Sequence, residues 1–268
     1  MAFTIAISNQ KGGVGKTTSA VSLGSELALG GRRVLIIDLD PQGNASSVLG
    51  VELPEEGQDL YDMFFGEVSL ADIVRPSMIE DLNVAPSSGD LVSIELELGK
   101  TPGRELILKS QLARLSDDYD YVLIDCPPSS GLLTLNALGA ADYILIPLQA
   151  EYYALEGLSA LMRTVDFVQN TFNPHLSILG VFLTMYDSRT NLSAQVENEV
   201  KEHLPEVTFK TRIPRNIRLS ECPSHSLPIC LYDPNSSGAI AYHELAVELD
   251  DKLMELHGPT GQGQVANG

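Results

Sequence analysis

The residues with the clearest chemical potential lie within residues 8–18, where three glycines precede a lysine and two threonines. Glycines let the backbone turn so that its N–H groups converge on one spot, and the start of a following helix adds the positive end of its dipole. Lys16 would add a full positive charge at that spot, and the hydroxyl of Thr17 could hold Mg²⁺. This combination predicts a loop that binds phosphate groups.

The loop departs at one position from the strict phosphate-loop pattern G-x-x-x-x-G-K-[ST]. Gln10 stands where the pattern has its first glycine, and Lys11 follows it directly. A glycine-rich turn that merely joins a strand to a helix is the alternative, but such a turn would need neither Lys16 nor Thr17. The sequence therefore favours a variant phosphate-binding loop.

Acidic residues follow two further apolar runs of the chain. Asp38 and Asp40 come after residues 33–37, and Asp125 ends residues 119–125. The ligand crevice of a parallel sheet lies outside the carboxyl ends of its strands, so these acids are expected beside the phosphates. Asp40 would act on a water molecule or on Mg²⁺, and Asp125 would be a second acid associated with Mg²⁺. For Asp38 alone, a turn built on Asp-Pro and Gly-Asn explains the residue at least as well.

Strand and helix patterns that must position these residues alternate along the chain. Short apolar runs predict strands, and apolar residues at three- and four-residue spacing predict helices. We expect strands at 3–7, 33–37, 82–85, 119–125, 142–147 and 179–185, and helices at 17–29, 60–65, 70–74, 91–98, 105–115, 154–172, 192–203 and 237–256. This alternation predicts a doubly wound α/β fold of the P-loop NTPase type, with a mostly parallel sheet and helices on both faces.

The length of 268 residues and a hydrophobic content of 44% suit a single domain over residues 1–257 that contains the phosphate-binding loop (P-loop), followed by a disordered tail at 258–268. No apolar run reaches 18 residues and no basic stretch precedes the first one, which predicts a cytoplasmic protein without a membrane contact. The cysteines Cys126, Cys222 and Cys230 show no C-x-x-C spacing. The absence of that spacing and the odd number of cysteines argue against a disulfide framework, a zinc site and an iron–sulfur cluster.

The formal net charge of −19 is distributed unevenly along the chain. Residues 51–99 hold twelve acidic residues and one arginine, whereas residues 207–218 hold four basic residues and no acid. The acidic stretch is either a solvated face or a docking surface for a basic partner peptide. Non-specific binding to DNA needs lysine and arginine, so the overall charge is unusual for a protein that binds DNA.

Five motifs in order make the chain resemble the ParA/Soj chromosome- and plasmid-partitioning ATPases of the ParA/MinD superfamily, over nearly its whole length. These are KGGVGKTT at 11–18, which is the deviant Walker A motif, DLDPQGN at 38–44, DCPPS at 125–129, EYYALEG at 151–157 and IPRNIRLSE at 213–221.

The resemblance implies ATP/ADP and Mg²⁺ as cofactors, and it assigns roles to particular residues. The implied catalytic residues are Lys11, Lys16, Asp40 and Asp125. The implied nucleotide contacts are Lys11, Gly12, Gly13, Val14, Gly15, Lys16, Thr17 and Thr18, with Met185, Pro214 and Arg215 on the adenine side. Thr17 would bind Mg²⁺ directly, whereas Asp40 and Asp125 would act on it through water. Lys11 would reach the nucleotide of a partner protomer, so that ATP binding produces a homodimer.

In function, the resemblance implies slow hydrolysis of ATP to ADP and phosphate, stimulated by a centromere-binding partner of the ParB type. The ATP-bound dimer would bind DNA without sequence preference through Arg189 and Arg218, which would place it on the nucleoid. An ATP dimer that positions a cargo other than DNA is the alternative, because the chain is strongly acidic and residues 234–238 lack basic side chains. A MinD-like membrane switch, an iron–sulfur carrier and a metabolic kinase are disfavoured by the tail, the cysteine positions and Lys11, respectively.

Overall fold

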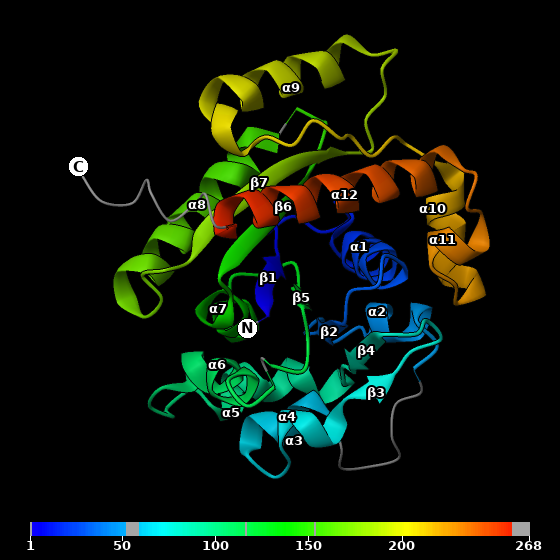
Figure 1. Ribbon diagram of the computed structural model, residues 1–268. Helices are drawn as coiled ribbons and strands as arrows, with labels where there is room; N and C mark the ends of the chain where they lie inside the picture. The colour runs from blue at the N-terminus through cyan, green and yellow to red at the C-terminus, as the bar shows by residue number, and fades with distance from the viewer. Residues whose placement is uncertain (1, 52–58, 116, 153, 259–268) are drawn as a thin grey trace.

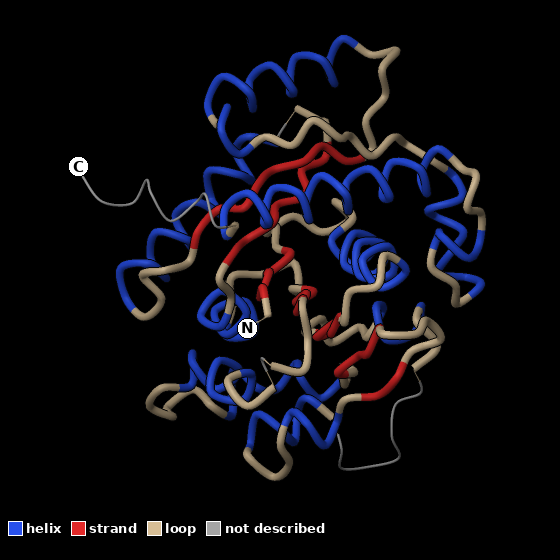
Figure 2. The backbone as a smooth tube through the Cα atoms, in the orientation of Figure 1, coloured by secondary structure: helices blue, strands red, loops and turns tan. Residues whose placement is uncertain are grey.

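A seven-stranded sheet forms the centre of the protein in a computed structural model that describes residues 2–51, 59–115, 117–152 and 154–258 (Figures 1 and 2). The strands are β1 (Phe3–Ile7), β2 (Val34–Asp38), β3 (Arg75–Pro76), β4 (Leu82–Ala85), β5 (Tyr121–Asp125), β6 (Tyr143–Gln149) and β7 (Ser177–Thr184). Their order is β3-β4-β2-β5-β1-β6-β7. All neighbouring strands are parallel except β3 and β4.

Helices cover both faces of this sheet. The core on one face includes residues of α1 (Lys16–Leu29), α2 (Asn44–Val48), α11 (Ile229–Tyr232) and α12 (Ser237–His257), and α10 (Ile217–Glu221) packs against it. The core on the other face includes residues of α3 (Leu60–Phe65), α4 (Leu70–Ile73), α5 (Ile94–Glu97), α6 (Ile107–Leu112), α7 (Leu132–Ala140), α8 (Ala154–Thr171) and α9 (Asn191–His203). Four 3₁₀ turns complete the described structure: η1 (Gly89–Ser93), η2 (Arg104–Leu106), η3 (Pro205–Val207) and η4 (Cys222–His225).

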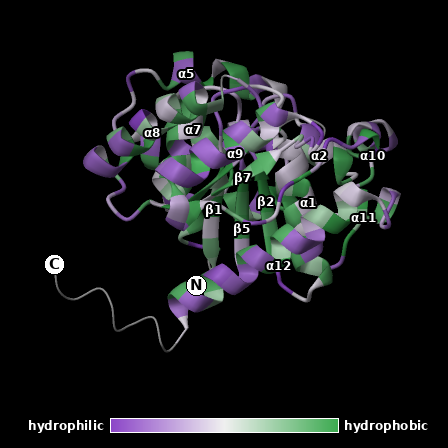
Figure 3. Cartoon of the chain, turned by 90° about the horizontal axis from the view of Figure 1, so that it is seen from above, coloured by the Kyte–Doolittle hydropathy of each residue, from purple (hydrophilic) through white to green (hydrophobic). Residues whose placement is uncertain are grey.

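Alternate residues of each central strand enter opposite cores, because successive side chains of a strand point to opposite faces. In β2, Val34 and Ile36 join the core beneath α1 and α12, whereas Leu35 and Ile37 join the core beneath α7 and α8. A strand buried on both sides has to be apolar at every position, which is why it reads as a continuous apolar run. Figure 3 shows these apolar strands between helices that carry their polar residues outward.

The predicted fold class is confirmed, and each predicted strand has a counterpart in the sheet. Helix α1 begins at Lys16, one residue earlier than expected. Helix α7 was not predicted, because it is buried on several sides and so lacks the polar stripe that reveals a surface helix. The short helices α2, α10 and α11 and the edge strand β3 were also not predicted.

All three cysteines have free thiols, and Cys126 and Cys222 are buried. None of the helices in the described ranges is long and apolar enough to cross a membrane. The predicted tail at 258–268 lies outside the described residues apart from Gly258, and the single-domain boundary stays a prediction.

Candidate nucleotide site

The loop between β1 and α1 has the backbone that its glycines predict. Gly13 has a φ of 75° and Gly15 a φ of 93°, a left-handed region that side chains with a Cβ rarely adopt. Gly15 is the N-cap of α1, so the first turn of the helix starts at Lys16. The free N–H groups of that turn and the positive end of the helix dipole therefore face the predicted phosphate position.

Hydrogen bonds to the strands β6 and β7 and to the helix α1 hold this loop in place. The Asn9 side chain donates to the Pro147 carbonyl in β6 at 2.8 Å and accepts from the Lys11 N–H at 3.0 Å. The Thr184 hydroxyl at the end of β7 donates to the Val14 carbonyl at 2.8 Å. Within α1, the Ser19 hydroxyl donates to the Gly15 carbonyl at 2.6 Å. The loop is thus fixed before any ligand binds.

Gln10 explains the departure from the strict phosphate-loop pattern. Its side-chain amide donates to the Thr164 hydroxyl at 3.0 Å and to the Ala160 carbonyl at 3.3 Å, both on α8. A glycine could make neither bond. The variant position therefore ties the phosphate loop to a helix on the other side of the sheet.

Lys16 is buried, with 6% of its surface exposed, and its ammonium donates to the Lys11 carbonyl at 3.1 Å. Burial lowers the pKa of Lys16 from its ordinary value, and the nearby carboxylate of Asp125 opposes that shift. A buried ammonium with one neutral acceptor gains from an anion brought into its reach. This setting fits a lysine that binds phosphate.

Lys11 carries the second positive charge of the loop and lies farther out. Its ammonium forms an ion pair with Glu151, which follows β6. The Lys11 side chain is 40% exposed and that of Glu151 is 29% exposed. Glu151 begins the EYYALEG motif, but the sequence alone indicates no role for it, because its partner Lys11 lies far away in the chain.

Asp38 and Asp125 lie side by side at the carboxyl ends of β2 and β5, where they are paired in register. Both are fully buried. Ser46 donates its N–H and its hydroxyl to one oxygen of Asp38, at 2.8 and 2.7 Å. Within the described part of the chain, the other oxygen of Asp38 and both oxygens of Asp125 have no hydrogen-bond partner.

Desolvation raises the pKa of both carboxyl groups. It raises the pKa of Asp38 to about 6, although the two bonds from Ser46 oppose the shift. It also raises the pKa of Asp125, with the charge of Asp38 as the next contribution, against the opposing effects of Thr17 and Lys16. Asp38 is therefore part of a buried acidic pair, whereas the sequence alone could equally have explained it as a turn residue.

An Asp38→Asn variant is expected to change how stability depends on pH. Because the folded-state pKa of about 6 exceeds the ordinary value of 3.8, the stability linked to this proton is present below about pH 4 and is lost as the pH rises through 6. Between pH 4.5 and 7.5 the variant should gain about 2 kcal/mol in free energy of unfolding relative to the wild type. Urea unfolding of the nucleotide-free protein measures this.

The matched control for that experiment is Asp251→Asn, since Asp251 is exposed on α12. Its free energy of unfolding relative to the wild type should be nearly constant over the same pH range. A constant difference for Asp38→Asn as well would contradict the raised pKa.

The unpaired oxygens of Asp38 and Asp125 fit a cation at this edge of the sheet. Mg²⁺ prefers oxygen ligands such as carboxylates and phosphates, and it usually keeps several of its own waters. Thr17 is half-buried at the start of α1 and close enough to Asp125 to affect its pKa. The donor set of one hydroxyl and buried carboxylates suits Mg²⁺ bound to a nucleotide.

Asp40 differs from the two buried acids because its side chain is partly exposed. One carboxylate oxygen accepts from the Gln42 N–H at 3.1 Å, and the main-chain carbonyl accepts from the Ser87 hydroxyl at 2.5 Å. These bonds hold the loop after β2 in position, while the carboxylate stays accessible to water. Such a group can orient a water molecule for attack.

The three residues predicted on the adenine side meet in one pocket with the phosphate loop. Met185, Pro214 and Arg215 line a cavity of about 230 Å³ together with Val14, Gly15 and Thr18. The Tyr186 N–H bonds to the Ile213 carbonyl at 3.0 Å and so joins the end of β7 to the segment before α10. Met185 has a φ of 50°, a strained value for a residue with a side chain, as is common at ligand sites.

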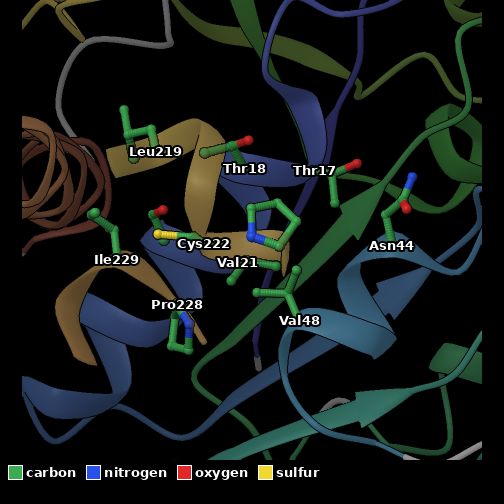
Figure 4. A pocket seen from close by; sticks show the side chains of 11 residues that line it. Thr17, Thr18, Val21, Asn44, Val48, Leu219, Cys222, Pro228 and Ile229 are labelled. Carbon is green, nitrogen blue, oxygen red and sulfur yellow. The ribbon is translucent and has the colours of Figure 1, made fainter. Parts of the chain in front are cut away.

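A neighbouring cavity of about 260 Å³ lies on the other side of Thr18 (Figure 4). Apolar side chains from four elements gather around it, namely Val21 of α1, Val48 of α2, Cys222 of η4 and Ile229 of α11. Sequence analysis missed this cavity, because three of these elements are too short to show a helical period.

The two arginines predicted to bind DNA are exposed, and acidic side chains neutralise both. Arg189 is 86% exposed and pairs with Asp187 through two bonds, at 2.9 and 2.7 Å. Arg218 is 53% exposed and pairs with Glu221 at 2.9 Å and with Asp233 at 3.3 Å. The Arg189 guanidinium lowers the pKa of Asp187 well below its ordinary value.

The predicted basic segment at 207–218 offers less free charge than its sequence suggests. Arg212 pairs with the buried Glu197 and lies 4.9 Å from the centre of the Tyr186 ring. Tyr186 also donates to Glu197, at 3.0 Å. Arg212 therefore fixes the segment that carries Pro214 and Arg215, a role that sequence reasoning missed.

Comparison with known proteins decides the family. The family model described as "AAA domain" matches residues 2–178. The sporulation initiation inhibitor protein Soj of Bacillus subtilis is 54% identical over 91% of this chain and 97% of its own length. The chromosome partitioning protein ParA of Myxococcus xanthus is 49% identical over 91% of this chain and 87% of its own length. The chain belongs to the Soj/ParA family of chromosome-partitioning ATPases.

The predicted resemblance to the Soj/ParA family is thus confirmed. Among solved structures, a Mycobacterium smegmatis protein named cobyrinic acid a,c-diamide synthase, with bound ADP and magnesium, has a TM-score of 0.82 and 37% identity, covering 96% of each chain. The family model covers the motifs at 11–18, 38–44, 125–129 and 151–157. The assignment of individual residues to nucleotide, metal or DNA remains a prediction from geometry.

Proposed function

We propose that this Soj/ParA-family protein is a Mg²⁺-dependent ATPase that dimerises on ATP, binds DNA and partitions a chromosome or plasmid. The observation that supports it best is the meeting of a preformed phosphate loop, a buried Lys16 and the unpaired carboxylate of Asp125 at one edge of the sheet. Structural neighbours with ADP and with an ATP analogue, each with magnesium, support ATP/ADP and Mg²⁺ as the cofactors.

In this proposal the chain positions the triphosphate and neutralises its charge. The loop N–H groups and Lys16 would bind the phosphates, the Thr17 hydroxyl would hold Mg²⁺, and Asp125 would act on the ion through water. Asp40 would orient the attacking water. Because positioning and charge neutralisation supply most of the catalysis in such transfers, slow turnover is expected until a partner completes the site.

The second loop lysine, Lys11, is proposed to act across a dimer interface. Lys16 already fills the position beside the buried acids, whereas the Lys11 side chain points out to the partly exposed Glu151. A lysine that reaches the phosphates of a second protomer would make their charge part of the interface energy. ATP binding would then be coupled directly to dimerisation.

The remaining proposals concern the partners and the place of action. A ParB-type centromere-binding protein would stimulate hydrolysis. The ATP-bound dimer would bind DNA through Arg189 and Arg218, so that this cytoplasmic protein would be associated with the nucleoid. Dimerisation doubles this small basic surface. A handful of phosphate contacts predicts weak binding that salt suppresses strongly.

Non-specific DNA binding is tested by measuring ATP-dependent binding to a random DNA duplex at about 50 and 200 mM salt. Binding is expected for the wild type at low salt, with a loss of at least about tenfold at high salt. An Arg189→Glu/Arg218→Glu double variant should lose it at both salt concentrations. A matched control is Arg163→Glu, which reverses an exposed arginine on α8. Equal binding by the wild type and the double variant would refute the assignment.

One observation favours a second candidate, an ATP dimer that positions a cargo other than DNA. Both predicted DNA-binding arginines are already paired with acids, on a chain of net charge −19. DNA phosphates would have to displace those carboxylates. If ATP dimerises the protein and no DNA binds at either salt concentration, the result supports positioning of a cargo other than DNA and contradicts partitioning through DNA binding.

A further inference from the structure

We propose that Glu151 holds Lys11 within its own protomer and so restrains dimerisation until ATP competes for the lysine. The inference rests on the proposed function, because it concerns the regulation of the same lysine. The observation behind it is the ion pair that the two side chains form within one protomer.

Both partners of the pair start from fixed backbone positions. The Lys11 N–H bonds to the Asn9 side chain at 3.0 Å, and the Lys11 carbonyl accepts from Lys16 at 3.1 Å. The Glu151 N–H bonds to the Gln149 carbonyl at 2.8 Å, and the Glu151 carbonyl accepts from Ala154 at the start of α8 at 3.0 Å. Only the side chains need to move for the pair to break.

The pair is also accessible enough to exchange its partner. Both side chains are partly exposed, and ion pairs at such sites are weak because water competes for each charge. A triphosphate carries several negative charges and offers more acceptor oxygens than one carboxylate. The phosphates of a second protomer can therefore displace Glu151, whereas a protomer without a triphosphate opposite it cannot.

The expected size of the restraint follows from the population of free lysine. A partly exposed pair reduces that population by roughly two- to fivefold. A symmetric dimer breaks two pairs, so the dimer dissociation constant is raised by roughly four- to twenty-five-fold. The pair thus sets a threshold for dimerisation without entering the chemistry of hydrolysis.

The first test measures the pair itself in nucleotide-free protein. Reductive methylation with formaldehyde and a borane, followed by peptide mass spectrometry, gives the modification rate of each lysine. Glu151→Gln is expected to raise the rate at Lys11 at least about twofold and to leave the other lysines unchanged. The matched control, Glu156→Gln, removes an exposed carboxylate of the same motif and should change no rate. An unchanged rate at Lys11 in Glu151→Gln overturns the proposal.

The second test measures the dimer dissociation constant by analytical ultracentrifugation with Mg²⁺ and a non-hydrolysable ATP analogue. Glu151→Gln should lower that constant roughly four- to twenty-five-fold, whereas Glu156→Gln should match the wild type. An equal or higher constant in Glu151→Gln overturns the proposal, because Glu151 would then not restrain dimerisation. If the wild type and both variants stay monomeric, the proposed dimerisation fails and the restraint with it, while the methylation rates still report whether the pair exists.

Discussion

An Asp40→Ala variant is expected to bind ATP and to hydrolyse it at least about a hundredfold more slowly than the wild type. Asp40 is the one of the three acids at this edge of the sheet that is accessible to water, since Asp38 and Asp125 are fully buried. Removing its carboxylate takes away the group that orients the attacking water and leaves the phosphate loop and Lys16 intact. The ATP-bound dimer should therefore accumulate.

Two measurements check this expectation on the same samples. Phosphate release under single-turnover conditions gives the hydrolysis rate, and sedimentation in ATP gives the fraction of dimer. Asp90→Ala, which removes an exposed carboxylate of η1, is the matched control and should hydrolyse ATP normally. Undiminished phosphate release by Asp40→Ala would remove Asp40 from the mechanism.

A Lys11→Ala variant is expected to bind nucleotide as a monomer and to lose ATP-dependent dimerisation. A charge-assisted hydrogen bond is worth about 1.5–3 kcal/mol, and a symmetric dimer would lose two of them. The dimer dissociation constant should therefore rise at least about a hundredfold. Lys16 remains in place in this variant, so nucleotide affinity of the protomer should change little.

Sedimentation with and without an ATP analogue separates this effect from a general loss of function, provided that nucleotide affinity is measured by fluorescence titration in parallel. Lys109→Ala, an exposed lysine on α6, is the control and should dimerise like the wild type. A Lys11→Ala protein with a normal dimer dissociation constant would contradict the trans role of this lysine.

The sequence predicted the central sheet and the phosphate loop well, because both have strong local signals. Short apolar runs between turn residues favour strands buried on both faces of a parallel sheet, and glycines beside Lys16 and Thr17 favour a phosphate-binding loop. Helix α7 was missed for the opposite reason: surrounded by apolar neighbours, it shows no polar face. Its existence depends on the packing of the whole layer.

Side-chain pairs between distant parts of the chain could not be predicted. Lys11 and Glu151, or Gln10 and Thr164, meet only because β1 and β6 are neighbours in the sheet. By contrast, the pairing of Arg189 with Asp187 had a visible signal, since the two residues are only two positions apart. The net charge of +4 for residues 207–218 is a sum over the sequence and takes no account of ion-pair partners. For this reason the sequence suggested a larger free basic surface than the structure has.

Gln10 has a consequence for how sequences of this kind can diverge. A glycine at position 10 would make no side-chain hydrogen bond, whereas Gln10 bonds to the Thr164 hydroxyl and to the Ala160 carbonyl. The carbonyl is present whatever residue stands at position 160, but the hydroxyl is specific to threonine or serine. Substitutions at position 164 should therefore accompany substitutions at position 10 in related sequences. The residue at position 160 should vary independently of position 10, restricted only by its packing.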